Sequence, residues 1–87
     1  MKVVVKAFGI LKEGVVTLDL EEGSTIRDAI RRLGEMYAKE IENLLITRAG
    51  EIDDEVLVFH NGVFVENAQT RLHDGELILT FPFITGG

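Results

Sequence analysis

Gly86 and Gly87 stand at the end of the printed sequence, and their chemistry is the easiest to state. Two consecutive glycines form the thinnest peptide possible, because they lack Cβ atoms and adopt backbone angles closed to other residues. Such a segment can enter a narrow channel in another protein. A carboxylate at Gly87 can there be adenylated at that protein's ATP site and become an acyl donor or a thiocarboxylate. The pattern therefore predicts a reactive end that partner proteins process.

Other residues with chemical potential stand beside features that explain them structurally. His60 and His73 each precede a dipeptide typical of turns, which favours a turn-flanking role over catalysis or metal binding. Ser24 and Thr25 stand where a helix is predicted to begin, and the acidic run 53–55 is typical of a solvated loop. The sequence holds no cysteine, so thiolate nucleophiles and thiolate metal sites are excluded. We expect no catalytic residue, no metal site and no bound cofactor.

Length and composition predict one soluble domain. The 87 residues are 46% hydrophobic and 28% charged, which suits a single core. Net charge is -6 and basic residues are scattered among acidic ones, so a nucleic-acid partner is not expected. No segment approaches the roughly 20 apolar residues of a membrane-spanning helix. Lys6, Lys12 and Glu13 interrupt the opening apolar run before it reaches signal-peptide length. We expect a cytoplasmic protein with no membrane partner.

The first half of the chain predicts two strands followed by a helix. Residues 2–8 are rich in valine, and residues 15–20 alternate between apolar and polar side chains, which indicates a hairpin. Thr25 and Asp28 have the spacing of a capping box, and Gly34 is expected to lie within the helix rather than to end it. The apolar stripe of this helix is predicted to be Ile26, Ala29, Ile30, Leu33 and Tyr37.

The second half predicts three further strands. Residues 41–54 indicate a short buried turn and then a surface loop, and residues 55–60 form an apolar strand that ends at Asn61-Gly62, a dipeptide typical of hairpin turns. Residues 63–65 return as a short strand, and residues 76–81 form the last strand, which Pro82 ends. The resulting fold class is α+β, a roll with a mixed sheet of about five strands packed on one main helix. We expect one domain over residues 1–82 and a flexible tail, 83–87, that ends in Gly-Gly.

Three segments carry a resemblance to a known family: Asn61-Gly62, Leu72-His73-Asp74-Gly75-Glu76 and Phe81-Pro82-Phe83-Ile84-Thr85-Gly86-Gly87. Together they resemble the small subunit of molybdopterin synthase, the MoaD family of ubiquitin-like sulfur carriers, and the resemblance covers nearly the whole chain. It implies a β-grasp (ubiquitin-like) fold. The family commonly has two prolines after the aromatic residue, whereas Phe83 follows Pro82 here, which bears on the stiffness of the tail and on its fit to a partner.

The resemblance implies a sulfur-transfer cycle at Gly87. An adenylyltransferase of ubiquitin-activating type (MoeB type) consumes ATP to adenylate Gly87, and a sulfur donor protein then supplies the sulfur of a thiocarboxylate. The large subunit (MoaE type) transfers that sulfur to cyclic pyranopterin monophosphate during molybdenum or tungsten cofactor biosynthesis. The chain would thus be the non-catalytic, sulfur-donating subunit of a transferase complex. The residues implied to enter the partner's active site are Phe83, Ile84, Thr85, Gly86 and Gly87.

The aromatic residues divide between the core and partner contacts. The resemblance implies a partner interface made by Phe8, Phe64, Phe81 and Pro82. From the strand pattern, Phe59 is expected in the core, while Phe64, Phe81 and Phe83 suit either place; an interface is favoured for Phe81 and Phe83.

Three other functions fit the same pattern. A ubiquitin-like protein modifier of the small archaeal modifier type would use Gly87 to form isopeptide bonds with lysines. A ThiS-type carrier for thiamine is disfavoured, because that group is usually shorter and lacks the step Phe81-Pro82. A plain binding module would keep its affinity after deletion of Gly86-Gly87.

Overall fold

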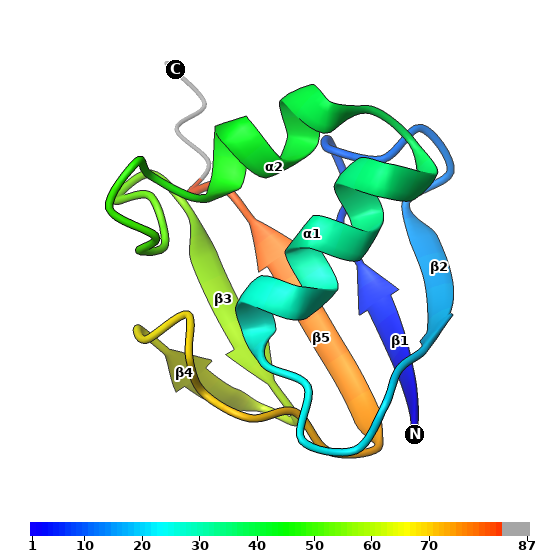
Figure 1. Ribbon diagram of the computed structural model, residues 1–87. Coiled ribbons are helices and arrows are strands. Elements are labelled where there is room, and N and C mark those ends of the chain that lie inside the picture. Colours follow the sequence, from blue (N-terminus) through cyan, green and yellow to red (C-terminus); the bar gives the residue numbers. More distant parts are fainter. Residues whose placement is uncertain (83–87) are drawn as a thin grey trace.

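The computed structural model describes residues 1–82, so the predicted tail lies outside the described residues. Two helices pack on one face of a five-stranded mixed sheet (Figure 1). The strands are β1 (Lys2–Lys6), β2 (Val15–Asp19), β3 (Leu57–His60), β4 (Val63–Val65) and β5 (Gly75–Thr80). The helices are α1 (Ile26–Met36) and α2 (Lys39–Leu45). The predicted α+β class, with about five strands and one main helix, is confirmed.

The sheet has the strand order β2-β1-β5-β3-β4. Strands β1 and β5 are parallel, while β1–β2, β3–β5 and β3–β4 are antiparallel pairs. Because β1 and β5 run the same way, both reach the same end of the sheet, and there β5 leads through Phe81 to Pro82 (Figure 1). None of the helices in residues 1–82 is long and apolar enough to cross a membrane.

Helix α1 begins at the predicted capping box. Thr25 is the N-cap: the Asp28 amide donates to Thr25 Oγ1 at 3.2 Å, and the Thr25 amide donates to Asp28 Oδ2 at 2.9 Å. The helix continues past Gly34, as predicted, and a Cβ there would lie 3.2 Å from Glu42 Cβ, so glycine permits close packing of α2. The prediction that Tyr37 belongs to the apolar stripe of this helix is wrong. It follows the last helical residue and is 44% exposed.

Helix α2 is a feature that the sequence did not reveal. Residues 41–54 were expected to form a buried turn and a loop, but α2 occupies Lys39–Leu45. The helix is short, and its N-cap, Ala38, makes no side-chain hydrogen bond, so the usual start signal is missing. Ile41, Leu44 and Leu45 recur at helical spacing, but over a single turn and with only Leu45 buried, so the stripe is too short to distinguish a helix from a buried turn.

Two predicted strands are shorter in the structure. Strand β1 ends at Lys6 instead of Phe8, because the chain turns after Ala7, whose carbonyl accepts from the Ile10 amide at 3.0 Å and from the Leu11 amide at 2.9 Å. Strand β3 starts at Leu57, because the preceding residues form a turn in which the Glu55 amide donates to Asp53 Oδ1 at 2.9 Å. Strands β2 and β5 match their predicted bounds to within one residue.

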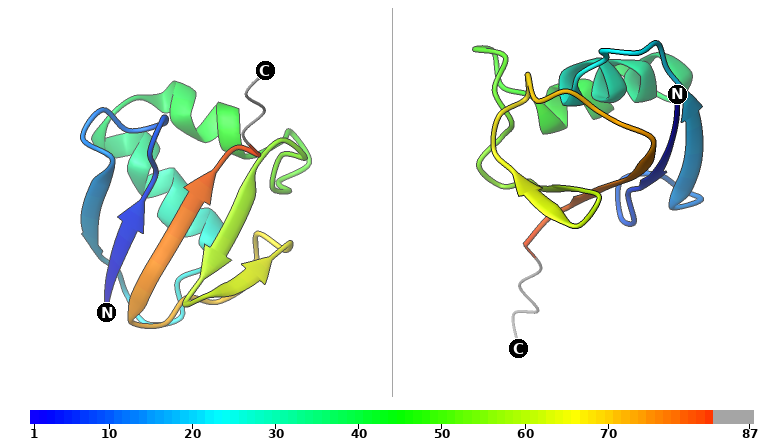
Figure 2. Two further views of the ribbon diagram at one scale, coloured as in Figure 1. Left: turned by 180° about the vertical axis from the view of Figure 1, so that it is seen from behind. Right: turned by 90° about the horizontal axis from the view of Figure 1, so that it is seen from below.

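The core lies between the sheet and α1. Alternate residues of the two central strands point toward the helix and are fully buried, including Val5 of β1 and Leu77 of β5, which stand opposite each other. Four of the five residues predicted for the α1 stripe complete this core: Ile26, Ala29, Ile30 and Leu33. The opposite side chains of each strand therefore form a second face, which no described helix covers (Figure 2).

Candidate docking face and tail

The uncovered face of the sheet, here called the outer face, carries a row of side chains that is apolar except for Lys6. Register places Val15, Lys6, Ile78, Phe59 and Phe64 side by side across all five strands. Directly opposed residues of neighbouring strands share a face, so these side chains lie on one surface. The two phenylalanine rings pack together, with centroids 5.6 Å apart. Three adjacent strands thus present a continuous apolar surface.

Polarity on the outer face changes along the strands. Toward the start of β5 the face is charged: Lys6 Nζ pairs with Glu76 Oε2 at 2.6 Å, and Lys2 Nζ lies 3.8 Å from Asp19 Oδ2. Toward the end of β5, Leu57 stands opposite Thr80. The apolar part therefore lies nearest to the end of the sheet at which the chain leads to Pro82.

Phe8, a predicted interface residue, is 64% exposed and yet held in position. Its ring packs against Gly14: a Cβ at Gly14 would lie 2.5 Å from two ring carbons. Gly14 also has a φ of +82°, a conformation that favours glycine. An exposed aromatic ring that the backbone already positions loses little conformational entropy when a partner covers it. Phe8 is thus suited to a contact role.

The other predicted interface residues lie in different surroundings. Phe64 is 50% exposed on the outer face. Phe81 is half-buried because its side chain packs against the core, so only part of it can meet a partner. Pro82 is exposed. The prediction that Phe59 belongs to the core is wrong, because it is half-buried on the outer face beside Phe64.

The residues expected to carry the chemistry are outside the described part of the chain. They are Phe83, Ile84, Thr85, Gly86 and Gly87. Their roles remain predictions.

His60 has a structural role. It is 7% exposed, and both of its ring nitrogens have partners: Nδ1–H donates to Glu76 O at 2.8 Å, and Nε2 accepts from the His73 amide at 2.9 Å. These partners assign the neutral ring with its proton on Nδ1. The two histidine rings also stack, with centroids 6.3 Å apart. The predicted turn-flanking role of both residues is confirmed, and sequence reasoning missed the contact between them.

Asn61 extends this network across the hairpin turn. Its φ is +50°, its Oδ1 accepts from the Glu76 amide at 2.8 Å, and its Nδ2 donates to Asp74 O at 3.2 Å. A Cβ at Gly75 would collide with the Asn61 side-chain amide, so glycine is needed there. This polar network fixes the start of β5, at the opposite end of the sheet from Pro82.

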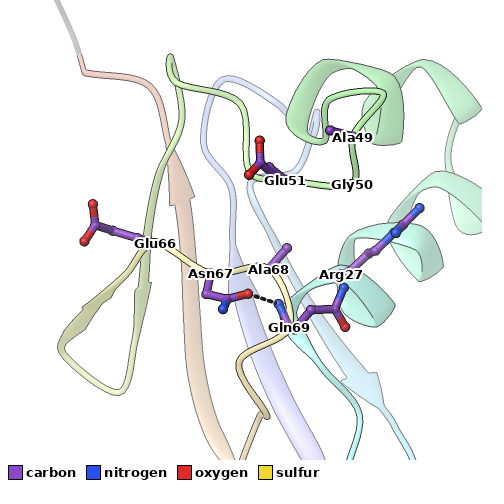
Figure 3. A pocket seen from close by; sticks show the side chains of 8 residues that line it. All are labelled: Arg27, Ala49, Gly50, Glu51, Glu66, Asn67, Ala68 and Gln69. Carbon is purple, nitrogen blue, oxygen red and sulfur yellow. Dashed lines mark hydrogen bonds between the residues drawn. The ribbon is translucent and has the colours of Figure 1, made fainter.

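A depression on the helix side is lined by residues that form no recognisable catalytic pair. It has a volume of about 400 Å³ and lies between the loop around Gly50 and the loop around Asn67 (Figure 3). Arg27 reaches into it from α1, and its Nη1 would lie 2.7 Å from a Cβ at Gly50. The buried Nε of Arg27 has no hydrogen-bond partner within residues 1–82. In that same part of the chain, no group of three or more histidine, aspartate or glutamate side chains is arranged to hold a metal ion.

Comparisons with known proteins concern the family and the fold of this chain. The family model described as the ThiS family matches residues 5–87. An uncharacterized protein of Archaeoglobus fulgidus is 37% identical over 71 residues, which are 80% of this chain and 74% of that protein. The crystal structure of SAMP1 from Haloferax volcanii is similar over 100% of both chains, with a TM-score of 0.74 and 28% identity.

A fourth similarity concerns the fold alone. A protein of Pyrococcus furiosus, provisionally named molybdopterin converting factor subunit 1, has a TM-score of 0.71 and 22% identity, over 94% of this chain and 98% of that one. The β-grasp architecture predicted from the sequence is therefore confirmed. Proteins of this family are small carrier subunits and not catalysts themselves. The chain belongs to the ThiS family, the ubiquitin-like sulfur carriers of ThiS and MoaD type.

Proposed function

We propose that this protein is the sulfur-carrying small subunit of a molybdopterin synthase and works in the cytoplasm through the carboxylate of Gly87. The observation that carries the proposal is the arrangement of the outer face. Its apolar surface lies toward the end of β5, where the chain leads through Pro82 to residues 83–87. A partner that covers this face would be well placed to receive those residues.

The proposed cycle begins with ATP on the adenylating partner. A carboxylate oxygen of Gly87 attacks the α-phosphorus of ATP, and pyrophosphate leaves. Hydrosulfide released by the sulfur donor protein then attacks the acyl carbon, and AMP and a proton leave, so that one carboxylate oxygen is replaced by sulfur. In the large subunit the sulfur passes to cyclic pyranopterin monophosphate, and water restores the carboxylate. The β-grasp domain contributes recognition to each step.

Genetic replacement in the native host tests this pathway. A strain without the chromosomal copy would receive the full chain or a chain that lacks Gly87, and molybdopterin would be measured in both. We expect molybdopterin only with the full chain. Equal molybdopterin from the two strains would refute the proposal, and a strain that instead requires thiamine would assign the chain to the thiamine pathway.

A protein-modifier function is the second candidate, because the similarity to SAMP1 of Haloferax volcanii extends over the full length of both chains. Modification would leave the C-terminal residues of this chain on the lysines of target proteins. Digestion of host proteins followed by mass spectrometry would detect those remnants, whereas a dedicated sulfur carrier would leave none.

A further inference from the structure

A groove lies at the sheet edge beside β4, and we call it the edge groove. It has a volume of about 150 Å³. Its apolar lining includes Val56 and Val65, which are buried, and Leu57 and Phe64, which belong to the outer face. The groove therefore combines a buried apolar floor with an opening on the outer face, which also carries Phe59. A long apolar stem would fit such a floor.

The edge groove is also negatively charged. Asp53, Asp54 and Glu66 line it, together with no lysine or arginine of residues 1–82. None of these three carboxylates forms an ion pair within that part of the chain. Glu66 also lines the depression that holds Arg27, yet the two side chains are not paired. The negative charge beside the apolar floor is thus uncompensated.

The acidic side chains suit an organic cation better than a metal ion. Within residues 1–82 no three carboxylate or imidazole side chains are arranged to hold a metal ion, the Asp53–Glu66 region included. Asp53 is in part committed to its own turn, because its Oδ1 accepts from the Glu55 amide at 2.9 Å. A lysine or arginine side chain combines an apolar stem with a cationic head that can reach carboxylates along a rim.

The edge groove is continuous with the proposed docking face. Leu57 and Phe64 belong to both, and Leu57 stands opposite Thr80, two residues before Pro82. We propose that the edge groove receives a lysine or arginine side chain of the protein that adenylates Gly87. This inference rests on the proposed function, because it needs a partner on the outer face. The apolar floor takes the stem of that side chain, and Asp54 and Glu66 face its cation.

Exposed charges at the edge of an interface, such as those of Asp54 and Glu66, act mainly on the rate of association and on its salt dependence. Neutralising both exposed carboxylates in the double variant Asp54→Asn/Glu66→Gln should lower kcat/KM for adenylation by about tenfold at low salt. The loss should shrink at high salt, because salt screens charges near the surface. The value of kcat should stay unchanged, because neither residue is near the reacting carboxylate in this proposal.

The test is ATP–pyrophosphate exchange by the host's own adenylating protein, with the full chain as the varied substrate. The matched control is Glu21→Gln/Glu35→Gln, which makes the same charge change at exposed positions outside the groove. We expect a raised KM and a weaker salt dependence only in the groove variant. Thermal melting would show that both double variants are folded. Equal kinetics for the two would then overturn the inference.

A third variant distinguishes a failure of this inference from a failure of the proposed function. A variant without Gly86-Gly87 should support no exchange. If it supports exchange as well as the full chain, or if the full chain supports none, the proposed function fails. If exchange needs the glycines but is indifferent to the groove charges, only the groove inference fails.

Discussion

At the scale of single residues, buried polar side chains show most clearly how the domain is held. His60 uses both ring nitrogens to bind the backbone around His73 and Glu76. The substitution His60→Leu keeps similar bulk but leaves the buried-side acceptor of the His73 amide missing, while the Glu76 carbonyl keeps only its second donor, the Asn61 amide at 3.0 Å. We expect a loss of about 1 to 3 kcal/mol in the free energy of unfolding, measured by urea denaturation.

His73→Ala is the matched control for that experiment. The His73 contribution comes from its backbone amide, which the substitution keeps, and its side chain is exposed. We therefore expect a change of only about 0.5 kcal/mol. Similar losses in the two variants would contradict the assigned hydrogen-bond network.

Gly14 tests whether the backbone positions the Phe8 ring. Gly14→Ala and Gly9→Ala both place a side chain at a positive φ, +82° and +85° respectively, and each should cost about 1 kcal/mol of stability. Only the alanine at Gly14 would meet the Phe8 ring, because a Cβ at Gly9 has nothing within 4 Å. Binding to the adenylating protein should therefore weaken in Gly14→Ala, as in Phe8→Ala, but not in Gly9→Ala. Calorimetry would measure the affinity of each variant for the adenylating protein. Equal affinities for the two glycine variants would disprove the positioning role.

Single residues also show a limit of sequence reasoning. Phe59 stands in an apolar run, which is compatible with a place in the core and equally with a surface place beside another aromatic ring. Only the register, which places Phe59 opposite Phe64 and Ile78, assigns it to the outer face. Similarly, no local pattern reveals that His60 and His73, distant in sequence, share a hydrogen bond.

At the scale of elements, the start of α1 could be predicted because its signal is local. Ser24 and Thr25 can both cap a helix, the capping-box spacing to Asp28 favours Thr25, and the structure assigns Thr25. Thr25→Ala should lower the free energy of unfolding by about 1 kcal/mol, because the Asp28 amide loses its acceptor. Ser24→Ala should have almost no effect, because Ser24 contributes its backbone carbonyl to the Leu72 amide. Urea denaturation would compare them, and equal losses would show that the cap was misassigned.

Helix α2 could not be predicted, because its stability comes from packing against α1. Leu45 is its one buried residue, and α2 approaches α1 closely where Gly34 leaves room for Glu42. Helices of this length are marginal without tertiary contacts, so propensity and capping carry little signal. The strands, by contrast, were placed well because alternation and the Asn61-Gly62 turn are local features.

At the scale of the whole molecule, one sheet face builds the core, and the other, which no described helix covers, is the proposed docking face. Phe64→Ala should weaken binding to the adenylating protein by about 10- to 30-fold, because truncated aromatic anchors cost most at interfaces. Val63→Ala is a useful control: Val63 is 65% exposed on the same strand, but it stands opposite His60 and so faces away from the outer face. Equal losses from both substitutions, measured by calorimetry, would contradict the assignment of the docking face.

The order of helices and strands was largely predictable from the sequence, whereas the outer face was only partly so, and the role of Gly87 stays a prediction. Phe8 and Phe64 are exposed as expected, but Ile78, Phe59 and the edge groove emerge only when distant strands are brought together. The identity of the sulfur acceptor depends on a partner surface, which the sequence of this chain does not contain.

The central claim is that Gly87 carries sulfur, and the mass of the intact chain purified from its native host tests it most directly. Fragmentation of the C-terminal peptide would place any change at a single residue. The account predicts that a fraction of the chain carries one sulfur in place of one oxygen, located at Gly87 and lost on incubation with cyclic pyranopterin monophosphate and the large subunit. A chain that keeps both carboxylate oxygens, even after treatment with ATP, the adenylating protein and the sulfur donor, would contradict it.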